Sequence, residues 1–253
     1  MPVSSLPDGK GAATGERVAL VTGGARRLGA AFTRALARRG YHVAIHHRRS
    51  TAEADALVRE IERAGGTARA FVADLATADA PEALVRDVVA SCGRLDVLVN
   101  SAANMLRTPV GSVTAAQWDE IFSLNVRAPF LAAQAAAAVM REGGLIVNIA
   151  DLAAFETWRG YIPHGMSKAA VVQMTRALAR ALAPNIRVNA IAPGVVLLPE
   201  GWEDASAERL ASTTPLRRLG GPEDVVHALE YFLDATFVTG EVLVVDGGRH
   251  VRR

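Results

Sequence analysis

Short runs of consecutive apolar residues alternate along this chain with longer segments in which apolar residues recur every three or four positions. The short runs are typical of strands buried on both faces, and the longer segments are typical of amphipathic helices. Strands are predicted over Arg17–Val21, Tyr41–His46, Ala68–Val72, Leu95–Val99, Leu145–Ala150, Arg187–Ala192 and Thr239–Asp246. Helices are predicted over Ala30–Arg39, Thr51–Ala64, Pro81–Cys92, Thr114–Met140, Tyr161–Ala183 and Leu219–Leu233. This alternation predicts an α/β fold, a doubly wound, Rossmann-like parallel sheet with helices on both faces, in a single domain.

Three stretches depart from this alternation. The long helical tract should bend near Asn125–Pro129, where Asn125 either faces solvent or bonds something specific, such as a water or a carbonyl. Residues 195–215, which contain Trp202 and several acids, predict an irregular segment of the kind that forms lids or is disordered. Residues 1–15 are rich in Gly, Ser, Pro and Ala and predict a flexible tail, not a signal peptide, ahead of a domain over residues 16–253.

Composition narrows the possible functions. The chain has 253 residues, 50% of them hydrophobic, which is enough for one sizeable domain. The formal net charge is only +2 and the arginines are scattered, which argues against a nucleic-acid partner. No apolar run is long enough to cross a membrane, so no membrane partner is expected. Cys92 is the only cysteine, and the lack of an internal disulfide fits the cytoplasm, where we expect a small-molecule substrate.

Lysine is almost absent from this chain. The 28 Lys and Arg residues include only two lysines, Lys10 and Lys168. Arginine is planar and always charged, whereas lysine is a compact donor on a flexible stem. A lone lysine in the body of the chain therefore indicates a specific role for Lys168, and chance survival of a surface lysine is the alternative.

A glycine-rich turn, Thr22–Gly29, joins the first predicted strand to the first predicted helix. Glycines let the backbone approach a pyrophosphate, and a helix N-terminus offers free N–H groups and the positive end of its dipole. The spacing differs from a strict G-x-G-x-x-G, but its place between a strand and a helix favours a dinucleotide site.

The end of the second strand indicates which dinucleotide is bound. A cofactor with a free ribose 2′-hydroxyl is usually met by an acid at this point, and this chain instead has basic residues and a serine, His46–Ser50. Arg49 and Ser50, with Arg26 or Arg27 from the glycine-rich turn, suit a 2′-phosphate through charge-assisted hydrogen bonds. These residues predict NADP(H) rather than NAD; the alternative is a solvated basic loop.

Three chemically active side chains follow the strand Leu145–Ala150. Asp151 comes directly after it, and His164 and Lys168 stand four residues apart in the next predicted helix, hence on one face. A carboxylate, an imidazole and an ammonium group are therefore expected to meet at one point. An Asp–His pair is a recognised acid–base unit in which the acid orients the ring.

These motifs together resemble the short-chain dehydrogenases/reductases over residues 17–248. The matching positions are Thr22–Gly29, Asp74, Leu75, Asn100–Ala102, Asn125, Asn148, Lys168, Pro193, Gly194 and Val245–Gly248. Within that family the chain is most similar to the pteridine reductases. The similarity lies in the turn TGGARRLG, a second strand ending His-x-x-Arg-Ser, the acid at Asp151, and a Met-Ser-Lys-Ala segment similar to their Met-Ala-Lys.

The resemblance implies an NADP(H) cofactor, a homotetramer, and roles for particular residues. The implied catalytic residues are Asp151, Lys168, which would hold the nicotinamide ribose, and Asn125, which would hold a water near it. His164 is added to this set on the chemistry of its imidazole and not on the resemblance. The implied cofactor-binding residues are Gly23, Arg26, Arg27, Leu28, Gly29, His47, Arg49, Ser50, Asp74, Leu75, Asn100, Ser101, Ala102, Lys168, Pro193, Gly194 and Val195.

The chain departs from the family pattern at the position of the catalytic tyrosine. Four residues before the lysine the family has Tyr, and this chain has His164; Tyr161 is nearby but does not match the motif. An imidazole can transfer protons at neutral pH without help from a lysine. The alternatives are a degenerate site that only binds NADPH, or a buried histidine bonded to backbone.

A second departure concerns the surface that a flat substrate would stack on. Pteridine reductases tend to have an aromatic residue where this chain has Met105 and Leu106. Methionine can pack on a flat ring; otherwise Phe155, Trp158 or Trp202 supplies the surface, unless these are packing residues.

Three functions therefore remain open from the sequence. The first is NADPH-dependent reduction of a dihydropterin or dihydrofolate with an Asp151/His164 proton relay. The second is a non-catalytic NADPH-binding protein, such as a sensor or a partner subunit. The third is a carbonyl reductase or alcohol dehydrogenase of the same fold, since a fold alone does not decide among these.

Overall fold

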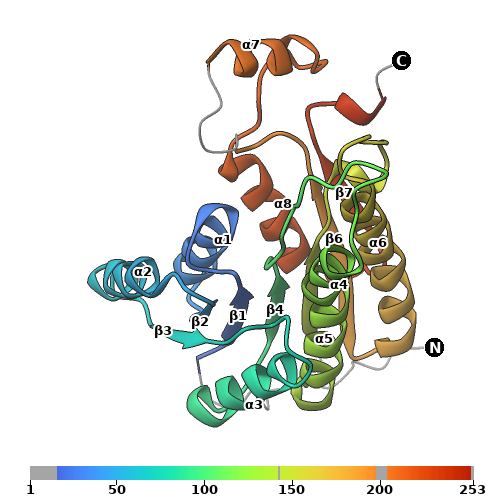
Figure 1. Cartoon of the computed structure of the whole chain (residues 1–253). Coiled ribbons are helices and arrows are strands. Elements are labelled where there is room, and N and C mark those ends of the chain that lie inside the picture. Colours follow the sequence, from blue (N-terminus) through green and yellow to red (C-terminus); the bar gives the residue numbers. More distant parts are fainter. Residues whose placement is uncertain (1–15, 142, 198–203, 252–253) are drawn as a thin grey trace, which may run out of the picture.

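The computed structural model describes residues 16–141, 143–197 and 204–251 (Figure 1). Seven strands form one parallel sheet in the order β3-β2-β1-β4-β5-β6-β7. The strands are β1 (Val18–Thr22), β2 (His42–His47), β3 (Ala68–Val72), β4 (Val97–Asn100), β5 (Gly144–Ile149), β6 (Ile186–Pro193) and β7 (Val242–Val245). The predicted tail, residues 1–15, lies outside the described residues, as does Trp202.

Helices cover both faces of this sheet (Figure 1). They are α1 (Arg27–Arg38), α2 (Thr51–Arg63), α3 (Ala80–Cys92), α4 (Ala115–Phe122), α5 (Ala128–Val139), α6 (Ile162–Leu182), α7 (Asp204–Ser212) and α8 (Pro222–Asp234). Three shorter helical turns are η1 (Ser123–Arg127), η2 (Leu152–Ala154) and η3 (Arg249–Val251). The predicted doubly wound parallel sheet is confirmed.

Successive residues along a strand belong alternately to two separate hydrophobic layers, one on each face of the sheet. Along β1, Ala19 and Val21 belong to a cluster that includes residues of α1, α2 and α8, whereas Val18 and Leu20 belong to one that includes residues of α3, α5 and α6. Successive strand side chains point to opposite faces, so a strand covered on both sides needs an unbroken apolar run. This requirement explains why these strands could be predicted from the sequence.

The order of the strands places the site. From β1 the chain adds β2 and β3 on one side, and it then crosses to add β4 to β7 on the other side. In such sheets ligands bind outside the carboxyl ends of the strands, where the strand order reverses. The segments following β1, β4, β5 and β6 therefore converge at this edge.

Two predictions about the irregular stretches have different outcomes. The predicted interruption of the helical tract near Asn125–Pro129 is confirmed, because a five-residue π-helical turn, η1, separates α4 from α5. The prediction that residues 195–215 are irregular throughout is wrong, because α7 lies within them. Its sequence, DASAERLAS, is rich in residues of good helix propensity, which the acids and Trp202 nearby obscured.

Buried asparagines join the strands beneath the site. Asn100 donates to the side-chain oxygen of Asn148 at 2.9 Å, and Asn148 in turn donates to the Thr175 hydroxyl at 2.9 Å. Asn148 is fully buried. Buried amides cost free energy unless they are bonded, so these bonds fix the ends of β4 and β5 relative to α6.

Within the described ranges, no helix is both long enough and apolar enough to cross a membrane. The homotetramer and the cytoplasmic location stay predictions.

Replacing Asn148 by alanine removes both of these hydrogen bonds from the core. We expect the free energy of unfolding to fall by about 1–3 kcal/mol, because buried donors and acceptors lose their partners. Urea unfolding followed by circular dichroism measures the change. Asn185→Ala, at an exposed position, is the control and should stay within about 0.5 kcal/mol. Equal effects of the two substitutions would contradict the assignment.

Candidate active site

A cavity of about 620 Å³ opens at the carboxyl edge of the sheet, beside the ends of β1, β2 and β3. Most of the predicted cofactor-binding residues lie together in its wall. These are Gly23, Arg26, Arg27, Leu28, Gly29, Arg49, Ser50, Asp74, Leu75, Ser101, Ala102 and Lys168.

The glycine-rich turn is packed too tightly for side chains. Gly23 has a φ of +64°, and a Cβ on Gly29 would stand 2.1 Å from the carbonyl oxygen of Gly23. The turn is held by β2, since the N–H groups of Gly23 and Gly24 donate to the His46 ring and its carbonyl at 3.0 and 2.9 Å. The first turn of α1 contains no acid, so its positive end faces the cavity without a competing charge.

The rim of this cavity is basic where β2 ends. Arg26, Arg27, Arg48, Arg49 and Ser50 all contribute to it. Arg26 also pairs with Glu53 at 3.7 Å, and Arg48 pairs with Asp74 at 3.6 Å. These exposed pairs hold the guanidinium groups only weakly. The rim therefore offers a cluster of cations and a hydroxyl to an anionic group.

His46 connects the turn to the sheet, and its protonation state follows from its partners. Its Nδ1 accepts the Gly23 N–H, so the proton is on Nε2, which donates to the Ala73 carbonyl at 3.1 Å. The ring is 3% exposed. Burial lowers the pKa of His46 to about 4, against the weaker effect of the bond to Ala73.

Five of the predicted cofactor-binding residues lie away from this cavity. His47 is buried, and its Nδ1 has no hydrogen-bond partner among the described residues. Asn100 belongs to the buried asparagine network. Pro193, the last residue of β6, and Gly194 and Val195, which follow it, line a second cavity.

The second cavity, of about 500 Å³, lies beside the first and holds the predicted acid. Its lining residues are Met105, Asp151, Leu152, Trp158, Arg159, Gly160, Tyr161, Pro193, Gly194, Val195, Leu197, Leu210 and Arg249. Most of this wall is apolar, with a few charged groups, which is typical of a small-molecule site. Of the candidate flat surfaces, Met105 and Trp158 lie in this wall; Phe155 and Leu106 do not.

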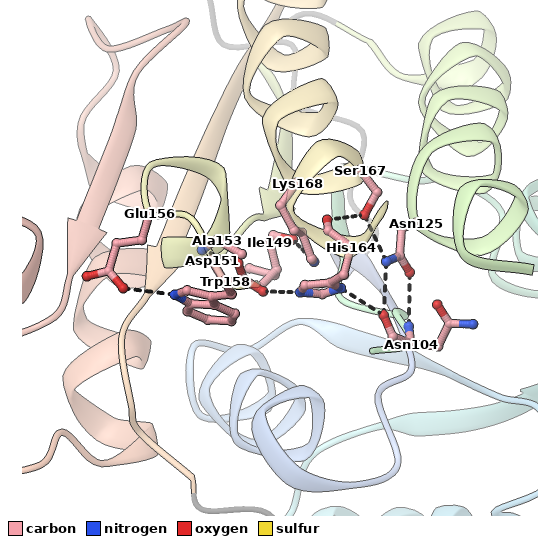
Figure 2. Close-up of polar contacts among 10 residues, drawn as sticks. All are labelled: Asn104, Asn125, Ile149, Asp151, Ala153, Glu156, Trp158, His164, Ser167 and Lys168. Atoms are coloured by element: carbon pink, nitrogen blue, oxygen red, sulfur yellow. Dashed lines mark hydrogen bonds and ion pairs between the residues drawn. The ribbon is translucent and has the colours of Figure 1, made fainter. Parts of the chain in front are cut away.

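Asp151 and His164 form a direct pair (Figure 2). The carboxyl Oδ2 of Asp151 lies 2.7 Å from Nε2 of His164, and Nδ1 of the same ring lies 3.1 Å from the Asn104 carbonyl oxygen. The other carboxyl oxygen of Asp151 accepts the Ala153 N–H at 2.7 Å. The His164 side chain is 3% exposed and that of Asp151 is 23% exposed, so the carboxyl faces the cavity and the ring lies behind it.

The first turn of α6 and the bend at η1 hold the ring from the other side. The Asn125 amide donates to the Asn104 carbonyl at 2.9 Å and to the Ser167 hydroxyl at 3.1 Å, and its oxygen accepts the Asn104 N–H at 2.9 Å. Ser167 donates to the His164 carbonyl at 2.7 Å. Asn125 therefore bonds a specific partner, the Asn104 carbonyl in the segment after β4, which is one of the two expectations for it.

Lys168 lies one helical turn after His164 and reaches the first cavity. Its ammonium group donates to the Ile149 carbonyl at 2.8 Å, and the side chain is almost wholly buried (Figure 2). Burial lowers the pKa of Lys168, opposed only in part by the charge of Asp151. Burial raises the pKa of Asp151, but the hydrogen bond from His164 and the charge of Lys168 outweigh it, and the net shift is downward.

Of the three side chains expected to converge, Asp151 and His164 are in direct contact, and Lys168 lies near enough for its charge to lower the pKa of Asp151. Sequence reasoning did not single out several other residues that line the two cavities or hold side chains in them. These are His46, Arg48, Asn104, Glu156, Ser167 and Arg249. Ser167 and Arg48 stand inside motifs that had been singled out. Asn104 contributes its backbone carbonyl, and because every residue has one, the residue type gives no indication of this role.

Comparison with known proteins agrees with this geometry. Residues 23–250 match a family model described as Enoyl-(Acyl carrier protein) reductase. The chain is 36% identical to human Dehydrogenase/reductase SDR family member 4, over 92% of this chain and 87% of the human protein.

Two solved structures are similar over nearly the whole fold. The first, a blue fluorescent protein from a metagenomic library in complex with NADPH, has a TM-score of 0.87 and 37% identity, covering 93% of this chain and 98% of the other. The second, FolM Alternative dihydrofolate reductase 1 from Brucella canis complexed with NADP, has a TM-score of 0.89 and 36% identity, covering 94% and 95%.

The neutral, buried state of His46 makes the stability of the fold depend on pH. Its pKa is about 4 in the folded protein and about 6.5 in the unfolded chain, so the unfolded chain takes up a proton first as the pH falls. We expect the contribution of neutral His46 to the free energy of unfolding to be fully present above pH 6.5. It should be lost as the pH falls to about 4, by roughly 3 kcal/mol in all. Urea unfolding at a series of pH values measures this loss.

His46→Asn is the matched variant, because its amide oxygen replaces Nδ1 as the acceptor for Gly23 and does not titrate. The difference in the free energy of unfolding between the wild type and this variant should become smaller as the pH falls from 6.5 to 4. Parallel stability curves would contradict the role assigned to His46.

Proposed function

The chain belongs to the short-chain dehydrogenase/reductase family, and on that basis we propose that it is an NADPH-dependent reductase of pterin-like substrates, a dihydropterin or dihydrofolate. The observation that carries this proposal is the carboxyl group of Asp151, which faces a substrate-sized cavity and is backed by a buried imidazole. A carboxyl group in that position can exchange protons with a basic ring nitrogen.

The first cavity fits the phosphates of NADP(H). Gly23 and Gly29 would let its pyrophosphate approach the backbone, and Arg49 and Ser50, with Arg26 or Arg27, would hold the 2′-phosphate. When bound, NADPH supplies the hydride of the reaction. Both solved relatives described above were crystallised with this cofactor, as NADPH or NADP, which supports the same assignment here.

The hydrogen bonds of His164 decide how a proton moves. The Asn104 carbonyl can only accept, so the proton on Nδ1 of His164 stays in place, and exchange takes place at Nε2. The Asp151 carboxylate relays a proton from Nε2 of the protonated imidazole to the substrate nitrogen and is a carboxylate again afterwards. His164 is left neutral with its proton on Nδ1, and a proton from solvent then restores the pair.

The carboxyl group of Asp151 favours one kind of substrate over another. A carboxyl group can both donate to and pair with a basic ring nitrogen or amino group, whereas a neutral hydroxyl would favour a carbonyl oxygen. The Trp158 and Met105 side chains in the same cavity offer a flat or adaptable apolar surface to a heterocycle. The dihydrofolate reductase named among the solved relatives supports a pterin ring as the substrate.

Lys168 and Asn125 support this centre in different ways. Lys168 lies in the wall of the first cavity, beside the acid, where it would hold the nicotinamide ribose. Asn125 contacts Asn104 and Ser167, and through them it positions the ring of His164. A water held by Asn125 stays a prediction.

Two other functions make different predictions. A carbonyl reductase or alcohol dehydrogenase of this fold would oxidise NADPH with ketones and not with dihydropterins, and the matching enoyl-reductase family model keeps that alternative open. A non-catalytic NADPH-binding protein would bind the cofactor and oxidise it with neither. The Asp151–His164 pair favours catalysis, because a cofactor sensor has no need of it.

Arg49→Ala tests the cofactor assignment. We expect the KM for NADPH to rise about 10-fold and that for NADH to stay unchanged, because only NADPH carries the 2′-phosphate. Steady-state kinetics with both cofactors measure this. Arg59→Ala, an exposed arginine on α2 outside the cavity wall, is the control. A proportional loss with both cofactors would contradict the assignment.

Substitutions of the acid–base pair test the chemistry. The wild-type protein should oxidise NADPH with dihydrobiopterin and dihydrofolate. Asp151→Asn should lower kcat about 10²–10⁴-fold, and His164→Phe should abolish turnover, while the Kd for NADPH stays within about 2-fold. Stopped-flow absorbance at the NADPH band and fluorescence titration provide these readings.

Tyr161→Phe is the matched control, since this phenol lines the same cavity but is not the motif residue. It should retain turnover. Unchanged turnover in His164→Phe, or loss of turnover in Tyr161→Phe, would overturn the proposed proton relay. A comparison of His164→Tyr with the wild type shows whether the phenol that the family usually has works in the same place.

A further inference from the structure

One charged side chain in the substrate cavity has no part in the proton relay. Arg249 lies in η3, after β7, and its side chain is only 14% exposed and lines the same cavity as Asp151. The Nε and Nη1 groups of Arg249 are buried without a hydrogen-bond partner among the described residues. Buried N–H groups without partners are rare in folded proteins and cost free energy, so a ligand that bonds them binds there favourably.

The structure holds Arg249 in position from two sides. The Asp246 carboxyl accepts the N–H groups of Gly248 and His250 at 2.8 and 2.6 Å and the His250 ring at 2.8 Å, which fixes the turn. Glu156 lies 3.6 Å from Nε of Arg249, close enough for an ion pair but too far for a hydrogen bond. The guanidinium group of Arg249 is therefore held in a fixed position, and its Nε and Nη1 donors can still bond another acceptor.

Trp158 spans the distance between this guanidinium and the catalytic pair. Its indole N–H donates to Glu156 at 2.9 Å, and its ring lies 6.5 Å from the His164 ring at an interplanar angle of 15°. In Figure 2 the indole lies between Glu156 and the Asp151–His164 pair. A flat ring that reaches Asp151 would thus pass over Trp158, and its substituent would extend toward Arg249.

The charges that line the cavity indicate the nature of that substituent. Two carboxylates, Asp151 in the wall and Glu156 beside Arg249, stand against two guanidinium groups, Arg159 and Arg249, of which only Arg249 is largely buried. This balance of charge accommodates a singly charged carboxylate better than a doubly charged phosphate. Guanidinium binds carboxylate through paired, charge-assisted hydrogen bonds.

We propose that Arg249 binds a carboxylate on the side chain of the substrate, so that the preferred substrates are pterin-like heterocycles that carry an acidic tail. This inference rests on the proposed reductase function and adds the substrate class to it. Arg249 is a binding residue in this scheme, and Glu156 and Asp246 are positioning residues for it.

The experiment compares two substrates that share a dihydropterin ring. Dihydrofolate carries carboxylates on its side chain, and dihydrobiopterin carries none. Arg249→Gln should lower kcat/KM for dihydrofolate about 10–100-fold, mainly through KM, and should change that for dihydrobiopterin less than about 3-fold. Arg249→Lys, which keeps the charge but loses the planar fork, should recover part of the loss.

Arg180→Gln is the matched control, because it removes an exposed cation of α6 outside both cavity walls and should change kcat/KM for either substrate less than about 3-fold. NADPH binding and thermal unfolding show that the variants are folded. Equal losses with both substrates, no loss with either, or an equally large effect of Arg180→Gln would overturn the proposal.

Binding measurements separate this proposal from the proposed function. If the wild type oxidises NADPH with both substrates and Arg249→Gln does not discriminate them, the acidic-tail site is wrong and the reductase function stands. If the wild type oxidises NADPH with neither substrate, the reductase function is wrong. Equilibrium dialysis of folate and biopterin then tests the site alone, since only folate should bind more weakly to Arg249→Gln.

Discussion

One backbone carbonyl, that of Asn104, constrains the chemistry of the whole site. It accepts from Nδ1 of His164 and from the amide of Asn125, and being a carbonyl it can donate to neither. The ring therefore keeps one proton and exchanges the other with Asp151. The bend at η1, the hydroxyl of Ser167 and the start of α6 are all arranged around this acceptor, which gives an imidazole one defined direction in which to act.

The buried polar groups near the site are stable because their partners are fixed before any ligand arrives. Lys168 donates to the Ile149 carbonyl, and Asn148 bonds both Asn100 and Thr175 beneath it. His46 supports the glycine-rich turn in the same manner, as a neutral ring. Each group would be costly to bury alone, so the sheet edge is stable as a connected set of bonds rather than as separate contacts.

The sequence predicted the sheet and its order of elements because a doubly covered strand must be an apolar run, as in Leu145–Ala150. It also predicted that Asp151, His164 and Lys168 meet, since two are one helical turn apart and the third ends a strand. It did not indicate Asn104, whose contribution comes from the backbone, or Arg249, which lies 98 positions after Asp151 and reaches the cavity only through the fold. The helix α7 was missed because acids and a tryptophan obscured its helix-forming residues.

The two cavities draw on different parts of the chain. The first is lined by residues from Gly23 to Lys168, whereas the wall of the second also includes residues from the end of β6 onward, from Pro193 to Arg249. Sequence change in those later segments can alter what is recognised without disturbing the turn that faces the nucleotide. Proteins with this fold can therefore change their substrates while the residues of the first cavity stay the same. The Asp151–His164 pair lies between the two cavities, so it has to remain compatible with the residues of both.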